Sequence, residues 1–261
     1  MDKMKCIAKV AENDEDRLLF AKIYDKLCGA EQKNIPGVTM FLSPREQVLT
    51  RRMLHGMELT FYGGHDDAER KICCWLPEYL DQDWLISEDA PLAAVRASFY
   101  DKETLTHRDF LGGLMGSGIK RETVGDIYVG SGYCDFFVIK EVLPHVLQNL
   151  ISAGRTKLHL EQIQLNAVQV PVQTVREIRD TVSSLRLDSI VGSGFQMARG
   201  KASALIETGK VSLNDLPCLK PDKLLQEGDK ISARGFGKLF LSEVGGKTKK
   251  DRISIMITKL L

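Results

Sequence analysis

The side chains best suited to bind a partner are basic, and they are concentrated near the C-terminus. Residues 186–261 contain 14 Lys and Arg against 8 Asp and Glu, a net charge of +6, whereas residues 1–185 contain 22 against 27, a net charge of −5. A guanidinium group can donate two parallel hydrogen bonds to one phosphate, and a lysine supplies an undirected positive charge. The distribution indicates a polyanion as the partner of the C-terminal segment, with a solvated basic surface as the alternative.

Sequence patterns that would indicate an enzyme are incomplete. His107-Arg108-Asp109 resembles the start of a kinase catalytic loop, but Leu114 stands where that loop needs Asn. Gly246-Lys247-Thr248 resembles the end of a phosphate-binding loop, but Leu241 stands where that loop needs Gly. The six Cys contain no Cys-x-x-Cys pair, and the five His are scattered along the chain. We therefore expect no catalytic residue, no bound metal and no cofactor.

The first 88 residues are expected to form an N-terminal domain of helices and a hairpin. The prediction rests on apolar residues at helical spacing, on a capping box, and on segments that alternate apolar and polar residues. They predict a helix over 15–28 that stops at Gly29, a helix from Ser43-Pro44-Arg45-Glu46 to about Leu54, and a hairpin of strands at 57–62 and 71–76. The acidic, irregular segment 77–91 is a candidate boundary.

The central region, residues 89–165, has a legible order of elements. Strands are expected at 92–100, 124–129, 133–139 and 157–165, and helices at 108–116 and 141–153. The resulting order β-α-β-β-α-β is the ferredoxin-like split motif. Many RNA-binding domains have this architecture, and so do many metabolic domains, so the fold alone does not decide the function.

Residues 166–184 are expected to be a linker to a C-terminal module over 185–261. The module begins with two short helices and continues with strands. The expected elements are helices at 187–193 and 198–208, strands at 210–214 and 228–234, and a hairpin of 238–243 and 252–258 around the basic loop 245–250.

This C-terminal module resembles an S4 RNA-binding domain of the αL type. The family pattern is matched in order by Arg186-Leu187-Asp188, Ala198-Arg199, Leu205-Ile206, Gly209-Lys210-Val211, Asn214 and Gly228-Asp229. One departure is Ala198, where the family usually has a Ser whose hydroxyl can cap the second helix. The match covers about 45 residues, and its many residue types in one order make it specific.

The rest of the chain resembles the bacterial YlmH family. The resemblance is carried by Thr106-His107-Arg108-Asp109, Leu111-Gly112, Gly116, Gly118-Ile119-Lys120-Arg121-Glu122 and Gly125-Asp126-Ile127. It implies an α+β protein with an N-terminal α/β region, an RRM-like central domain and a C-terminal S4 domain. It also implies RNA binding, association with the large ribosomal subunit during rescue of stalled chains, and a link to cell division.

The candidate RNA-binding residues lie in three groups. Arg199 and Lys201 lie two apart at the start of a helix, about 200° around its axis, so they cannot share one stripe but can flank an RNA strand. The candidates are Arg186, Arg199, Lys201 and Lys210 in the first group, Lys247, Lys249 and Lys250 at the basic hairpin tip, and Arg108, Lys120 and Arg121 in the central region. For each residue, a solvated surface charge is the alternative.

The leading hypothesis is a non-enzymatic RNA-binding protein of the bacterial cytoplasm. No apolar stretch is long enough to span a membrane, and the N-terminus does not read as a secretory signal. The expected partners are ribosomal or transfer RNA and the large ribosomal subunit, with no membrane and no small-molecule substrate. Two alternatives remain open: an RNA-modifying or processing enzyme with an unrecognised active site, and a protein-interaction adaptor in cell division.

Overall fold

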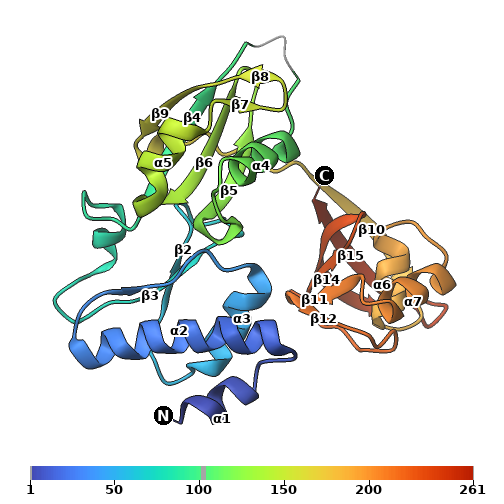
Figure 1. Ribbon diagram of the computed structural model, residues 1–261. Coiled ribbons are helices and arrows are strands. Elements are labelled where there is room, and N and C mark those ends of the chain that lie inside the picture. Colours follow the sequence, from blue (N-terminus) through green and yellow to red (C-terminus); the bar gives the residue numbers. More distant parts are fainter. Residues whose placement is uncertain (1, 101–103, 261) are drawn as a thin grey trace. The chain divides into compact units, whose positions relative to one another are not determined.

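The computed structural model describes residues 2–100 and 104–260 (Figure 1). The chain divides into two compact units, Met1–Pro171 and Val172–Leu261, which are described one at a time. Both units combine helices with antiparallel sheets, so the α+β class expected from the sequence is confirmed. Within the described residues, no helix is both long and apolar enough to cross a membrane.

Helices and a small sheet form the N-terminal part of the first unit. The helices are α1 (Lys3–Ala8), α2 (Asp14–Lys33) and α3 (Pro44–Met53). The predicted capping box of Ser43 and Glu46 is present at the start of α3. The predicted stop at Gly29 is wrong, because α2 continues for another turn and ends at Asn34, whose φ of 53° is left-handed.

The small sheet contains the predicted hairpin and one further strand. Its strands are β1 (Gly37–Val38), β2 (Thr60–Tyr62) and β3 (Ile72–Trp75), in the order β1-β3-β2. The acidic segment that follows contains the 3-10 helix η1 (Gln82–Ile86).

The element order expected for the central region is present. Its sheet has the order β5-β6-β4-β9, formed by β4 (Leu92–Ser98), β5 (Val124–Val129), β6 (Tyr133–Ile139) and β9 (His159–Ile163). The helices are α4 (His107–Gly116) and α5 (Leu143–Asn149). Short elements connect them: η2 (Arg121–Thr123), η3 (Lys140–Val142), β7 (Ser152–Ala153), β8 (Thr156–Lys157) and η4 (Leu165–Ala167). α5 is shorter than predicted because η3 precedes it and the β7–β8 hairpin follows it.

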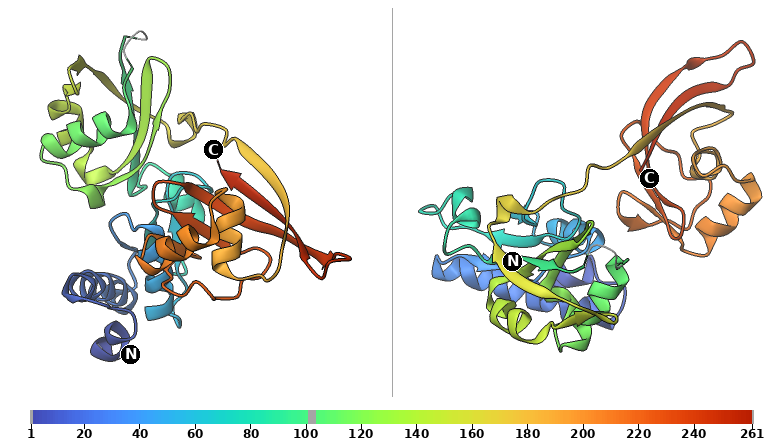
Figure 2. Two further views of the ribbon diagram at one scale, coloured as in Figure 1. Left: turned by 90° about the vertical axis from the view of Figure 1, so that its right-hand side faces the viewer. Right: turned by 90° about the horizontal axis from the view of Figure 1, so that it is seen from above.

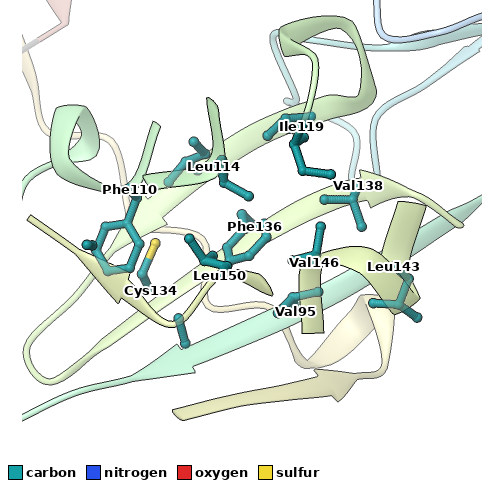
Figure 3. Packing of buried hydrophobic residues seen from close by; sticks show 14 of the residues in the cluster. Val95, Phe110, Leu114, Ile119, Cys134, Phe136, Val138, Leu143, Val146 and Leu150 are labelled. Atoms are coloured by element: carbon teal, nitrogen blue, oxygen red, sulfur yellow. The ribbon is translucent and has the colours of Figure 1, made fainter. Parts of the chain in front are cut away.

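The two helices pack on one face of the central sheet. Figure 3 shows Phe110 and Leu114 of α4 and Val146 and Leu150 reaching toward Phe136 of β6. All five side chains are at most 1% exposed. Period-two alternation along β6 gives this face Cys134, Phe136 and Val138.

The N-terminal elements cover the opposite face of the same sheet. The alternate residues of β4 and β6 point there and pack against the small sheet. This second core contains Phe41, Ile72, Cys74, Leu85, Leu92, Ala94, Phe137 and Ile139. The boundary expected near residue 88 therefore falls inside one compact unit.

The second unit packs two helices against one sheet. The helices are α6 (Leu187–Gly194) and α7 (Arg199–Glu207), close to their predicted bounds. The sheet has the order β10-β15-β14-β13-β11-β12. Its strands are β10 (Val175–Val182), β11 (Val211–Leu213), β12 (Leu216–Pro217), β13 (Lys230–Ala233), β14 (Gly237–Lys247) and β15 (Ile253–Leu260).

The segment expected as a linker, residues 166–184, contains a strand of this sheet. β10 pairs with β15 over eight residues, from Val175 opposite Leu260 to Val182 opposite Ile253. β10 therefore occupies residues 175–182 of this segment, and the division between the two compact units falls between Pro171 and Val172. Figure 2 shows the hairpin of β14 and β15, coloured red, projecting beyond the rest of this unit.

Candidate nucleic-acid interface

Asp188 lies at the centre of the basic cluster in the second unit. Its side chain is 3% exposed and accepts hydrogen bonds from two arginines. Arg186 donates from Nε at 3.2 Å and from Nη2 at 3.0 Å, and Arg199 donates from Nε at 3.1 Å and from Nη2 at 3.3 Å. The two arginine side chains remain 35% and 53% exposed. We call these three residues the arginine clamp.

Two helix starts bring the clamp together. Arg186 is the residue before α6, Asp188 lies in the first turn of α6, and Arg199 is the first residue of α7. The two helices share the buried core of the unit, in which Ile190 and Ile206 are both 0% exposed. The clamp is therefore fixed by the packing of its helices and by its own hydrogen bonds.

The charges of the clamp stabilise one another. Burial raises the pKa of Asp188, but hydrogen bonds and charge from Arg186 and Arg199 outweigh burial, so its pKa lies below the ordinary value. The hydrogen bonds to Asp188 raise the pKa of Arg186. Asp188 is consequently ionised at neutral pH, and one carboxylate beside two guanidinium groups leaves a net charge of one positive unit.

The other two basic candidates near these helices are exposed. Lys201 lies with its Nζ 5.8 Å from the centroid of the Phe236 ring, and Lys210 follows the end of α7. Arg199 contacts Asp188 instead, so the two residues face different partners, as their spacing predicts. A further lysine, Lys259, lies 5.2 Å from the ring of Phe195, a position that the sequence pattern did not reveal.

The basic hairpin tip is largely open to solvent. Lys247, Lys249 and Lys250 are all exposed. The Nζ of Lys247 lies 2.7 Å from a carboxylate oxygen of Asp251, which offsets its charge. Lys249 and Lys250 are thus the members of this group whose charge is more available to a partner.

In the first unit, Arg121 turns inward. Its Nη1 donates to the carbonyl oxygens of Val124 at 2.6 Å and Gly125 at 3.4 Å. Burial, together with the nearby charge of Arg70, lowers the pKa of Arg121 to about 10. The side chain is half-buried and holds backbone in place, so the structure favours a structural role where the sequence predicted an RNA contact.

The other two central candidates, Arg108 and Lys120, are exposed. Lys120 precedes η2, and Arg108 lies in the first turn of α4. Arg108 borders a cavity of about 490 Å³, which is also lined by Gly112, Gly116 and Asn149. Lys120 and Arg108 therefore remain candidates for a contact with a polyanion.

The central sheet does not offer its face for stacking of bases. RRM domains stack RNA bases on aromatic residues of an open sheet surface. Here one face carries α4 and α5 and the other carries the N-terminal elements, and Phe136 and Phe137 are both 0% exposed. An RNA partner of this region must therefore contact its edges, loops or helices.

Sequence reasoning missed a polar cluster between the small sheet and β5. The His65 Nε2 lies 2.5 Å from the Tyr128 hydroxyl, which in turn donates to Asp126 at 3.3 Å. Asp126 also accepts from the backbone amides of Glu69 and Arg70 at 2.6 and 3.1 Å. The bonds of Asp126 and Tyr128 to the loop before β3 join residues that are 56 to 63 positions apart, so no local signal could have revealed them. They fasten the loop before β3 to the central sheet.

Known proteins match most of the chain in sequence. Residues 93–167 match the family described as a putative RNA-binding domain in YlmH. The ribosome-associated protein quality control protein P2 of Bacillus subtilis (strain 168) is 37% identical over 218 residues, which are 82% of this chain and 84% of that protein. The solved structure of the cell division protein ylmH from Streptococcus pneumoniae matches with a TM-score of 0.49 and 22% identity, over 60% of this chain and 95% of that one. Arg108, Lys120 and Arg121 fall inside the matched residues 93–167.

Proposed function

The chain belongs to the YlmH family, and on this basis we propose that it is a non-enzymatic protein that binds RNA on the ribosome. The Bacillus subtilis relative is named for ribosome-associated quality control, and we extend that role to this chain. In this role the protein acts on ribosomes with stalled chains. A link to cell division, which the family resemblance implies, is then secondary.

The observation that carries the proposal is the arginine clamp. Guanidinium groups suit phosphate because their planar fork donates paired hydrogen bonds. Arg186 and Arg199 lie side by side, remain partly exposed and keep a net positive charge after Asp188 is counted. The second unit as a whole contains 16 Lys and Arg against 10 Asp and Glu, and this excess of positive charge attracts a polyanion to the unit over a longer range.

We assign an architecture to each binding region. The order β-α-β-β-α-β with strands arranged β5-β6-β4-β9 supports a ferredoxin-like, RRM-like domain in the first unit. The order of the two helices and the strands after them, together with the sequence motifs, supports an S4 domain in the second unit. In this scheme Arg186, Arg199, Lys201 and Lys210 contact RNA directly, Lys249 and Lys250 reach a second segment, and Arg108 and Lys120 add a weaker contact.

The proposed target is structured ribosomal or transfer RNA on the large ribosomal subunit. In this proposal the clamp contacts phosphates and responds to RNA shape, since contacts of Arg and Lys with phosphate oxygens position a protein on its nucleic acid. The test is sedimentation of the full chain with purified large and small subunits at low and moderate salt. We expect the protein to migrate with the large subunit and to dissociate as salt rises.

The decisive variants differ only in where they remove one positive charge. Arg199→Ala is expected to weaken RNA binding by about 10- to 100-fold, the usual value of a charge-assisted contact. Arg179→Ala is the matched control, because Arg179 lies on β10 next to Ile178 and therefore points away from the helices. If both variants weaken RNA binding equally, only a non-specific electrostatic attraction between the unit and RNA remains. That result would refute binding through the clamp. Failure to migrate with either subunit at low salt would refute the ribosomal target.

A further inference from the structure

Building on the proposed RNA binding, we propose that Asp188 is a positioning residue that holds Arg186 and Arg199 as a joint receptor for one phosphate group of an RNA backbone. The conventional view of such a site assigns binding to its cations. In this structure the anion beneath them determines where the cations are.

The hydrogen-bond donors of the clamp are divided between two tasks. Each guanidinium has five N–H groups, and the bonds to Asp188 use Nε and Nη2 on each arginine. Within the described residues, no other hydrogen bond of these two side chains is present. Nη1 of Arg186 and Nη1 of Arg199 therefore keep their donors for a ligand, and both side chains are partly exposed.

Charge is separated by depth within the clamp. The Asp188 side chain is 3% exposed, while the two arginine side chains are 35% and 53% exposed. A phosphate approaching from solvent thus meets positive charge first. The buried carboxylate reduces the repulsion between the two guanidinium groups and fixes both long side chains before RNA arrives, which lowers the ordering cost of binding.

A concave surface adjoins the clamp. A cavity of about 320 Å³ is lined by Asp188, Arg199, Gly192, Ser193 and Arg252, and by Asp180. The Asp180 carboxylate accepts a hydrogen bond from Ser193 at 2.6 Å, which satisfies part of its polarity. The cavity gives an RNA strand room to approach α6 while a phosphate engages the arginines.

The sign of one substitution tests the inference. Asp188→Asn preserves side-chain size and removes a negative charge, so attraction by total charge alone would tighten RNA binding. Positioning predicts the opposite. We expect affinity for labelled, refolded ribosomal RNA to fall about tenfold in filter binding. We also expect the slope of log affinity against log salt to fall by about one unit, because each lost phosphate contact contributes about 0.9.

Matched variants separate positioning from charge and folding. Asp215→Asn makes the same charge change in the turn before β12, where Asp215 pairs with Lys230 at 2.6 Å, and it is expected to keep or slightly raise the affinity. In an Arg186→Ala/Arg199→Ala background, Asp188→Asn is expected to cause no further loss, because nothing remains for it to position. Arg199→Lys retains the charge without the fork and is expected to weaken binding several-fold.

The outcomes distinguish this inference from the proposed function. Wild-type or tighter binding by Asp188→Asn, with binding lost in Arg199→Ala, overturns the positioning role and leaves the proposed function in place. Wild-type binding by both variants overturns RNA binding through the clamp, whereas absence of RNA binding by the unmodified chain overturns the proposed function itself. If circular dichroism shows that Asp188→Asn does not fold, Arg199→Lys decides, and full affinity in that variant overturns the inference.

Discussion

A buried aspartate pairs with arginine in both units, but the number of arginines for each aspartate differs. In the first unit, Asp135 is 0% exposed and accepts hydrogen bonds from Arg96 Nε at 2.7 Å and Nη2 at 2.6 Å, and another from the backbone N–H of Gln169 at 2.8 Å. One guanidinium meets one carboxylate there, so the charges cancel. In the second unit, one carboxylate meets two guanidinium groups, so a positive charge remains at the surface.

The difference shows that the number of acceptors decides what an arginine can do. Arg96 and Arg121 are both engaged by groups of their own unit, a carboxylate in one case and backbone carbonyls in the other. Arg186 and Arg199 share one acceptor, so part of their hydrogen-bonding capacity is free. A basic residue is therefore best judged as a binding candidate after its acceptors have been counted.

The largest effect is expected from breaking the one-to-one pair. Asp135→Asn should lower the free energy of unfolding of the first unit by about 3 kcal/mol, because the buried side chain loses its charge and its charge-assisted hydrogen bonds to the partly exposed Arg96. The only tryptophans of the sequence, Trp75 and Trp84, lie in this unit, so tryptophan fluorescence during urea unfolding reports on it selectively. RNA affinity should be unchanged. A loss of affinity while the second unit stays folded would contradict the separation of roles.

A smaller effect is expected from two neighbouring basic residues in the first unit. Arg121→Ala should destabilise this unit by about 1–2 kcal/mol, because it removes the hydrogen bonds to Val124 and Gly125. Lys120→Ala should change stability by less than about 0.5 kcal/mol, because Lys120 is exposed. Urea unfolding followed by tryptophan fluorescence compares the two. Equal stabilities would show that Arg121 is not structural.

The shared carboxylate predicts a pH dependence of the second unit. Because the pKa of Asp188 is lower in the folded state, its stabilisation is present above about pH 4, the ordinary aspartate range, and is lost as pH falls through the folded value. The second unit contains no Trp or Tyr. Its acid transition should appear in far-UV circular dichroism without a matching change in tryptophan fluorescence. Asp188→Asn should flatten that transition, and an unaltered transition would argue against the clamp.

The smallest effect is expected at the hairpin tip. Lys249→Ala and Lys250→Ala should each weaken RNA binding about twofold and lower the salt slope by about one unit, since their contacts are solvated. Lys247→Ala should have less effect, because Asp251 already offsets its charge. Filter binding across a salt series checks the order, and a larger effect from Lys247 would reverse it.

Elements with strong local signals could be predicted from the sequence. Ser43 and Glu46 announce the start of α3, and the apolar alternation of the central region gives its order of strands and helices. β10 could not be predicted, because it is an edge strand whose only buried residue is Val182, so its alternation is weak. The packing of the N-terminal elements on one face of the central sheet was missed, because it joins segments that are far apart along the chain.

The sequence identified the residues of the candidate site but could not predict the hydrogen bonds between them. Arg186, Asp188 and Arg199 follow from residue types in a recognisable order. That one carboxylate serves both arginines depends on how α6 and α7 pack, which spacing alone does not give. The half-buried position of Arg121 could not be predicted for a related reason, since a buried guanidinium looks the same in sequence as an exposed one.

The two-sided cover of the central sheet constrains how this protein is synthesised and how it can be dissected. Phe41 and Ile72 leave the exit tunnel long before Phe137 and Ile139, the residues on which they pack. A nascent chain that ends before β6 therefore exposes apolar surface, which favours aggregation until β6 has been synthesised. For the same reason, a fragment limited to residues 93–167 exposes Phe137 and Ala94, so the smallest soluble piece of this unit begins near the N-terminus.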